Sequence, residues 1–217
     1  MKIVLFLLPF LSFAAPTPSP WPVAFTINFL SNITTGSKDQ THAIHNTLYY
    51  DWNTKNQAVV HGPGAFECAH FYNTTGPCTL LFTATEMYRL LHQFTTKQQQ
   101  CCIDLTNLGT LPPSWPSKTN ATYLGNITDP FSGQSVEEFA WPQDASPMGM
   151  HSYLESIATH RPVTFTFPVH DGIQDYHFNT QSQIIGRPNA TVFDLPPGCL
   201  GMICNKQKSL KARNYKN

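Results

Sequence analysis

The stretch Val23-Ala-Phe-Thr-Ile-Asn-Phe29 decides the fold class of this chain. Its apolar residues occupy every second position, with small or polar residues between them. Because successive side chains of a β-strand point to opposite faces, this period of two predicts a strand with one buried face. Val163-Thr-Phe-Thr-Phe167 repeats the pattern late in the chain. The two segments predict a sheet that buries aromatic side chains on one side.

Shorter apolar runs fill the rest of the chain, separated by breakers such as Gly62-Pro63-Gly64. Helical patterns are expected only near 65–71 and 114–118. About ten strands in succession predict an all-β fold with one or two short helices. We expect one strongly curved antiparallel sheet, a half-open barrel with a hydrophobic concavity. The further strands are expected over 44–51, 57–61, 79–83, 87–92, 98–105, 122–125, 135–141, 150–157 and 173–185.

The first fifteen residues have the layout of a secretory signal peptide. A positive start at Met1-Lys2 precedes a short apolar run, and small residues lead up to Ala15. The run is too short to cross a hydrocarbon core of about 30 Å. We therefore expect a signal peptide over 1–15, a single β-rich domain over 16–204 and a basic, disordered tail over 205–217, in a secreted protein.

Five Asn-X-Thr sequons agree with export. A single match arises easily by chance, but five behind a signal peptide predict a glycoprotein. Attached glycans would help a chain with only 12% charged residues to stay in solution. Each occupied site must face solvent. The sequons begin at Asn32, Asn73, Asn120, Asn126 and Asn189.

Six cysteines, an even number in an exported chain, predict three disulfides. The neighbours Cys101 and Cys102 are expected to reach different partners, because a bridge between adjacent residues is strained. The first two cysteines are expected to close a local loop. The last two are expected to pair with the doublet, in an order that the sequence leaves open. The six are Cys68, Cys78, Cys101, Cys102, Cys199 and Cys204.

The zero net charge hides an uneven distribution. Five Lys and Arg residues lie within 205–217, and without Lys2 the remaining body carries seven of them against thirteen Asp and Glu. The tail is expected to be a solvated segment, with contact to an anionic lipid or sulfated surface as the alternative. A nucleic-acid partner is excluded by the export signal and by the lack of a basic patch in the body.

Motifs for catalysis or metal binding are weak. The imidazoles of His42-x-x-His45 would point to opposite faces of a strand, and so would the carboxylates of Glu137-Glu138. We expect no catalytic residue, no metal site and no cofactor. A secreted hydrolase is the least favoured alternative. Its acid–base groups would be His170, Asp171, Asp175 and His177.

Several motifs in order resemble the ependymin-related proteins. Cys101-Cys102-Ile-Asp-Leu105, Pro113-Ser-Trp115 and Ala121-Thr-Tyr123-Leu-Gly125 resemble the central block of that family. His160–Phe167 looks like its late strand, and Phe193-Asp-Leu-Pro-Pro-Gly-Cys199 is similar to its closing motif. The resemblance covers roughly residues 43–199. One departure is that Val136–Trp141 lacks the cysteine that relatives commonly place near this Trp, which puts the family's disulfide map in doubt.

The resemblance implies a secreted or lysosomal glycoprotein with a deeply curved antiparallel sheet. It also implies a fold similar to bacterial lipoprotein carriers, with a hydrophobic pocket that can hold lipid. Calcium is implied by the resemblance alone, since no matching ligand set is visible in the sequence.

We therefore expect a non-enzymatic, disulfide-linked glycoprotein that binds a lipid or another hydrophobic small molecule in the concavity. The alternative is an extracellular matrix or adhesion protein with protein partners. Whether the chain is a monomer or a homodimer stays open. Arg89 and Arg161 are candidates for pairing with a head group. The expected ligand-binding residues are Phe25, Ile27, Phe29, Val163, Phe165 and Phe167, with Val23 as a further candidate.

Overall fold

The computed structural model describes residues 15–35, 38–71, 74–92, 101–118, 120–141, 151–169, 172–197, 199, 201, 203 and 204. Nearly all of the expected signal peptide and the whole basic tail lie outside these residues. So do Asn73, His170 and Asp171. No helix in the described part is long and apolar enough to cross a membrane.

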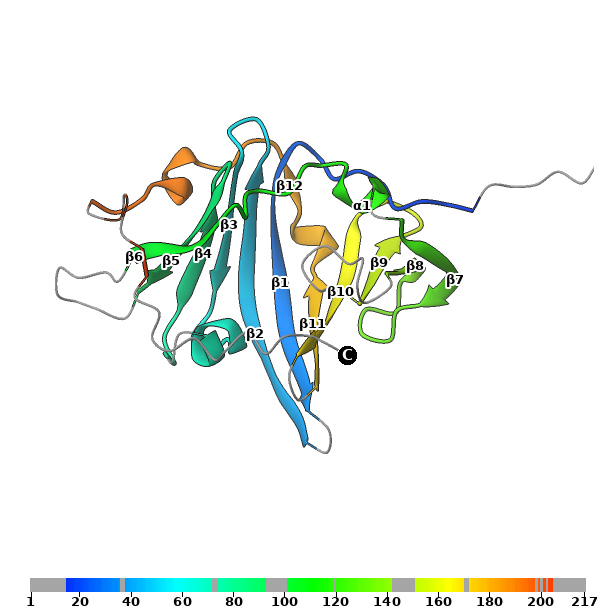
Figure 1. The fold of residues 1–217 in the computed structure, drawn as a ribbon. Helices are drawn as coiled ribbons and strands as arrows, with labels where there is room; N and C mark the ends of the chain where they lie inside the picture. Colours follow the sequence, from blue (N-terminus) through cyan, green and yellow to red (C-terminus); the bar gives the residue numbers. More distant parts are fainter. Residues whose placement is uncertain are drawn as a thin grey trace, which may run out of the picture.

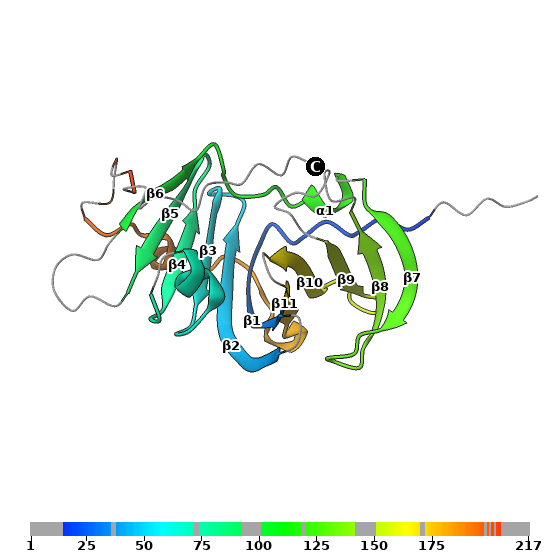
Figure 2. The ribbon, with the colours of Figure 1, turned by 60° about the horizontal axis from the view of Figure 1, so that its bottom comes forward.

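Twelve strands of the described residues form one antiparallel sheet, as the alternation predicts (Figures 1 and 2). The order across the sheet is β6-β5-β4-β3-β2-β1-β11-β10-β9-β8-β7, and β12 pairs with β1. Two meanders, β1 to β6 and β7 to β11, therefore join where β1 meets β11, and the path is open at β6 and β7. The strands are β1 (Ala24–Thr35), β2 (Lys38–Asp51), β3 (Asn56–His61), β4 (Cys78–Phe82), β5 (Glu86–Leu91), β6 (Cys101–Thr106), β7 (Thr122–Thr128), β8 (Ser135–Ala140), β9 (Ser152–Ser156), β10 (Pro162–Val169), β11 (Gly172–Phe178) and β12 (Ile184–Ile185).

One expected strand is divided. The run over 173–185 is β11, a 3-10 turn η3 (Thr180–Ser182) and the short β12. The side chain of Asn179 accepts a hydrogen bond from the backbone N–H of Gln181 and so caps η3. The chain is thereby turned, and β12 pairs with the start of β1. Both expected helical segments are present, as η1 (Glu67–Phe71) and α1 (Trp115–Lys118), and a further 3-10 turn is η4 (Ala190–Phe193).

The sheet curls toward one face, which we call the inner face. Val59 on β3 and Phe167 on β10 line the same cavity, although four strand-to-strand steps separate their strands. In a flat sheet these steps would amount to roughly 19 Å. The curvature predicted from the sequence is therefore a property of the structure (Figure 2).

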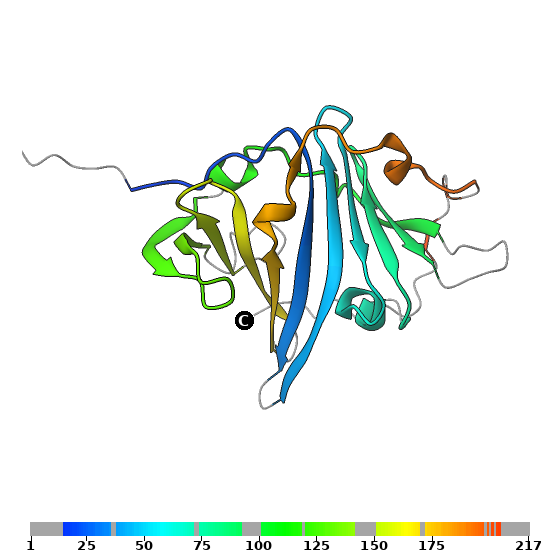
Figure 3. The same cartoon turned by 180° about the vertical axis from the view of Figure 1, so that it is seen from behind.

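The opposite, outer face is covered on one half by the C-terminal segment, which lies beside β3 to β6 (Figures 1 and 3). Phe193 and Leu195 pack there against buried residues of β3 to β6. Two disulfides fasten this segment to β6, namely Cys101–Cys199 and Cys102–Cys204. The third, Cys68–Cys78, joins η1 to β4. The expected pattern is confirmed, and the order that the sequence left open is settled.

Four sequons lie in the described part of the chain. Asn120, Asn126 and Asn189 are exposed, as occupied sites must be. Asn32 is half-buried on β1, and its side-chain oxygen is fully shielded from solvent.

Candidate functional site

The inner face carries an aromatic core. Side chains of β1, β2 and β8 to β11 meet there, together with Trp21 from the N-terminal segment and Trp115 from α1. The ring centroids of neighbouring aromatic residues lie about 5–6 Å apart, the range in which aromatic pairs attract one another. The buried members are Trp21, Phe25, Ile27, Phe29, Leu48, Tyr50, Trp115, Phe139, Trp141, Tyr153, Phe165 and Phe178.

A cavity of about 60 Å³ interrupts this core. Its floor is the inner face of β1, β2, β3, β10 and β11, and its cover is formed by Trp21, Leu111 and Trp115. The lining is apolar apart from one amide and one phenol. The lining residues are Trp21, Phe29, Leu48, Gln57, Val59, Leu111, Trp115, Phe165, Phe167, Tyr176 and Phe178.

The cover is held by two hydrogen bonds to carbonyl groups. The backbone N–H of Trp21 donates to the carbonyl of Pro113 at 2.8 Å. The hydroxyl of Tyr50 donates to the carbonyl of Leu111, also at 2.8 Å. Figure 1 shows the N-terminal segment and α1 at the same end of the sheet. Two segments far apart in the sequence thus line one side of the cavity together.

The expected ligand-binding residues divide into three groups. Phe29, Phe165 and Phe167 line the cavity. Phe25 and Ile27 have no exposed surface and belong to the surrounding core. The remaining two expected residues, Val23 and Val163, lie elsewhere.

Val163 does not line this cavity, but it is part of the lining of the larger cleft described below. A β-bulge between Pro162 and Thr164 breaks the register of β10 against β9. Val163 therefore faces away from the aromatic core and packs with Val136 and Leu154 in a small separate cluster. Simple alternation placed it with Phe165 because a bulge leaves no mark in the apolar pattern. Val23, at 55% exposure, is at the surface.

A buried polar group borders the cavity. Tyr176, which lines it, donates its hydroxyl proton to the carboxylate of Glu67 on η1. Gln174 donates to the same carboxylate at 2.6 Å, and His61 lies 3.5 Å from it. Burial, reinforced by Glu67, raises the pKa of Tyr176 well above its usual value, so the phenol stays a neutral donor. Burial lowers the pKa of His61, although Glu67 opposes this shift.

A larger cleft of about 730 Å³ involves β1, β2, β3, β10, β11, η3 and the loop between β7 and β8. Its lining combines amide, imidazole and hydroxyl groups with apolar side chains such as Phe29, Val163 and Phe178. Phe131 from the loop stacks on His177 with ring centroids 4.0 Å apart. Polar lining residues include Asn28, His45, Thr47, His61, Gln134, His177, Asn179 and Gln181.

The described members of the hydrolase set make ordinary strand contacts. Asp175 accepts a hydrogen bond from the hydroxyl of Thr166 at 2.8 Å. His177 lies 3.2 Å from the hydroxyl of Thr164, and burial lowers its pKa.

The two arginines expected to meet a head group lie outside both hollows. Arg161 donates to the carbonyl of Thr180 at 3.0 Å. Arg89 donates to the sulfur of Cys102 at 3.4 Å. Neither lines the cavity or the cleft.

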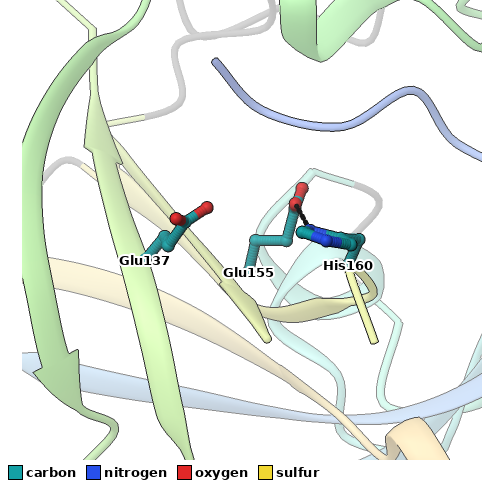
Figure 4. A group of neighbouring side chains, drawn as sticks. All are labelled: Glu137, Glu155 and His160. Carbon is teal, nitrogen blue, oxygen red and sulfur yellow. Dashed lines mark hydrogen bonds and ion pairs between the residues drawn. The ribbon is translucent and has the colours of Figure 1, made fainter. Parts of the chain in front are cut away.

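One group of described side chains has the composition of a metal site. Glu137 on β8, Glu155 on β9 and His160, which follows β9, place one ligand atom each within 4.8 Å of the others (Figure 4). Calcium takes six to eight oxygen ligands, so a group that includes an imidazole does not fit it. This group therefore does not match the calcium that the family resemblance implies. The sequence could not reveal the group, because its members come together only through strand pairing.

No protein-family model matches this sequence, and no curated protein is similar to it. Solved structures with a related outline do exist. An uncharacterized conserved protein from Thermus thermophilus matches at 11% identity with a TM-score of 0.49, over 82% of this chain and 88% of that one. A LolA superfamily protein from Nitrosomonas europaea matches at 9% identity and a TM-score of 0.36, over 83% and 99%. The Mycobacterium tuberculosis lipoprotein LppX matches at 10% identity and a TM-score of 0.35, over 71% and 84%.

Proposed function

We propose that this protein binds a lipid chain or another apolar small molecule on the inner face of its sheet. The observation that carries the proposal is the cavity between β3 and β10, lined almost wholly by aromatic and aliphatic side chains. Protein interiors normally pack as densely as organic crystals. A hollow in the middle of an aromatic core is therefore a feature to be explained, and an apolar ligand is what such a lining accepts.

The size of the cavity determines how a ligand enters. At about 60 Å³ it is well below the roughly 300 Å³ at which pockets for drug-sized ligands begin. A lipid chain must therefore displace the cover formed by Trp21, Leu111 and Trp115. Trp21, Leu111 and Trp115 lie outside the strands, so displacement of the cover would not require any strand pair to separate. Burial of a sixteen-carbon chain supplies roughly 10 kcal/mol at about 0.8 kcal/mol per CH₂, before the cost of ordering the ligand.

Secretion and a non-enzymatic role belong to the same proposal. Three disulfides indicate an oxidising compartment. The exposed sequons at Asn120, Asn126 and Asn189 favour glycosylation there. Membership of the ependymin-related proteins is proposed on the sequence motifs alone. The carrier role is favoured over catalysis because the inner face gathers apolar groups around its hollow.

Native mass spectrometry of the secreted, deglycosylated protein tests this function. We expect a co-purifying lipid, or uptake of one equivalent of a fluorescent sixteen-carbon fatty acid. A folded protein that neither carries nor takes up the fatty acid would contradict the carrier role. It would leave surface recognition of protein partners as the remaining interpretation.

A further inference from the structure

Strand pairing places two carboxylates opposite each other on the inner face. Glu137 of β8 is the register partner of Glu155 of β9. Like charges directly opposite in an antiparallel pair destabilise a sheet, unless a positive charge lies between them. The neighbouring Glu138 pairs with Leu154 and faces the other way. Figure 4 shows the carboxylate of Glu137 pointing toward Glu155 and His160.

Glu155 is fully buried, and its carboxylate accepts hydrogen bonds from neighbouring groups. One of its oxygens, Oε2, accepts hydrogen bonds from the backbone N–H of Ser19 at 2.9 Å and from the hydroxyl of Tyr153 at 3.1 Å. The other oxygen, Oε1, faces Nδ1 of His160 at 3.2 Å. Donors that hold one oxygen while the second faces outward are the usual support around a metal-ligating carboxylate.

Among the described residues, no side chain donates a hydrogen bond to Glu137 or forms an ion pair with it. Its half-buried carboxylate therefore faces a second, fully buried carboxylate, and within the described part of the chain only His160 forms an ion pair with either of them. A single imidazole cannot neutralise both carboxylates. A divalent cation can, and it would bind all three groups.

We propose that Glu137, Glu155 and His160 bind a divalent ion of the zinc class. Zinc accepts carboxylate oxygen and imidazole nitrogen at about 2.0–2.2 Å, which places neighbouring ligand atoms roughly 3.3 Å apart in a tetrahedron. Oε1 of Glu155 and Nδ1 of His160 are already 3.2 Å apart. Rotation of the half-buried Glu137 side chain would complete the set, and water would supply the fourth ligand.

The site lies beside the N-terminal segment that carries the cover. Ser19 is bound to Glu155, and Trp21 two residues later covers the cavity. An ion on Glu155 would fix this carboxylate and so strengthen the attachment of the segment. The site itself does not depend on the proposed lipid binding, because its ligands lie outside the cavity lining.

Isothermal titration calorimetry with zinc chloride, on the chelator-treated secreted protein at pH 7.5, tests the proposal. We expect one ion per chain, bound with at least tenfold lower affinity after Glu137→Gln or His160→Ala. Two matched controls are Glu138→Gln, the adjacent carboxylate on the other face, and His45→Ala, an exposed histidine on β2. Both are expected to bind zinc like the parent protein.

Two results would contradict the proposed zinc site. One is a parent protein that shows no saturable zinc binding. The other is equal zinc affinity in the parent, Glu137→Gln and His160→Ala proteins. Circular dichroism checks that these partly exposed substitutions leave the fold intact. Fatty-acid uptake measured on the same samples separates failure of the metal site from failure of the lipid proposal.

Discussion

The indole ring of Trp21 lies flat against the ring of Phe165, with centroids 5.7 Å apart and planes inclined by 4°. Trp21 belongs to the segment before β1, whereas Phe165 is in the middle of β10. The same indole meets Phe25, Tyr50 and Trp115 edge-on. One side chain from the N-terminal segment therefore joins both halves of the sheet and α1 over the cavity.

This position makes Trp21→Ala a strongly destabilising substitution. Removal of a buried indole from a well-packed core costs about 3–5 kcal/mol of the free energy of unfolding. Urea denaturation followed by circular dichroism measures the change. Val23→Ala, at a side chain that is 55% exposed, is the control and should cost under about 0.5 kcal/mol. Equal effects of the two substitutions would show that the segment does not act as a cover.

Phe167→Asp should abolish binding of a fluorescent sixteen-carbon fatty acid. Phe167 lines the cavity and is only half-buried, so the fold can tolerate the change. A carboxylate in the apolar lining would make burial of the hydrocarbon chain of the fatty acid unfavourable. Ile173→Asp places the same charge on an exposed position of β11 and should leave binding unchanged. Titration of both variants, after circular dichroism has confirmed folding, checks this. Unchanged affinity in Phe167→Asp would place the ligand elsewhere.

The strands and the inner-face aromatics were predictable because period-two alternation is a local property of the sequence. Phe29, Phe165 and Phe167 share one cavity as expected from their positions within their strands. The bulge at Val163 was not predictable, because it depends on how β10 pairs with β9.

The cover of the cavity and the group around Glu155 could not be predicted from the sequence, for a related reason. Both depend on contacts between segments far apart in the chain, such as Ser19 with Glu155 and Trp21 with Pro113. Alternation correctly separated Glu137 from Glu138, but only the register between β8 and β9 reveals that Glu137 faces another carboxylate. A local pattern determines which face a residue occupies, and strand pairing determines what it meets there.

The two disulfides at β6 should stabilise the protein non-additively. While Cys102–Cys204 remains, Cys101–Cys199 closes only a small ring of a few residues, worth about 2 kcal/mol in the chain-entropy model. Loss of both bridges also opens a loop of roughly 100 residues, for a total of about 7 kcal/mol. Serine pairs at each bridge and at both, compared by urea denaturation, measure the coupling. Strict additivity of the two losses would contradict the shared-loop explanation.

Stability should fall as the pH decreases below about 6.5, chiefly because of His61. Burial lowers the pKa of this histidine in the folded protein, against the opposing effect of Glu67 at 3.5 Å, so the unfolded chain binds a proton that the folded one resists. The contribution is fully present above the unfolded pKa of about 6.5 and is lost between that value and the lower folded pKa, by at most about 1.4 kcal/mol per pH unit.

Burial lowers the pKa of His92 and His177 as well, so some dependence should persist without His61. Urea midpoints between pH 7.5 and 5 should therefore vary less steeply in His61→Gln than in the parent protein. Parallel pH profiles for the two proteins would show that His61 does not contribute.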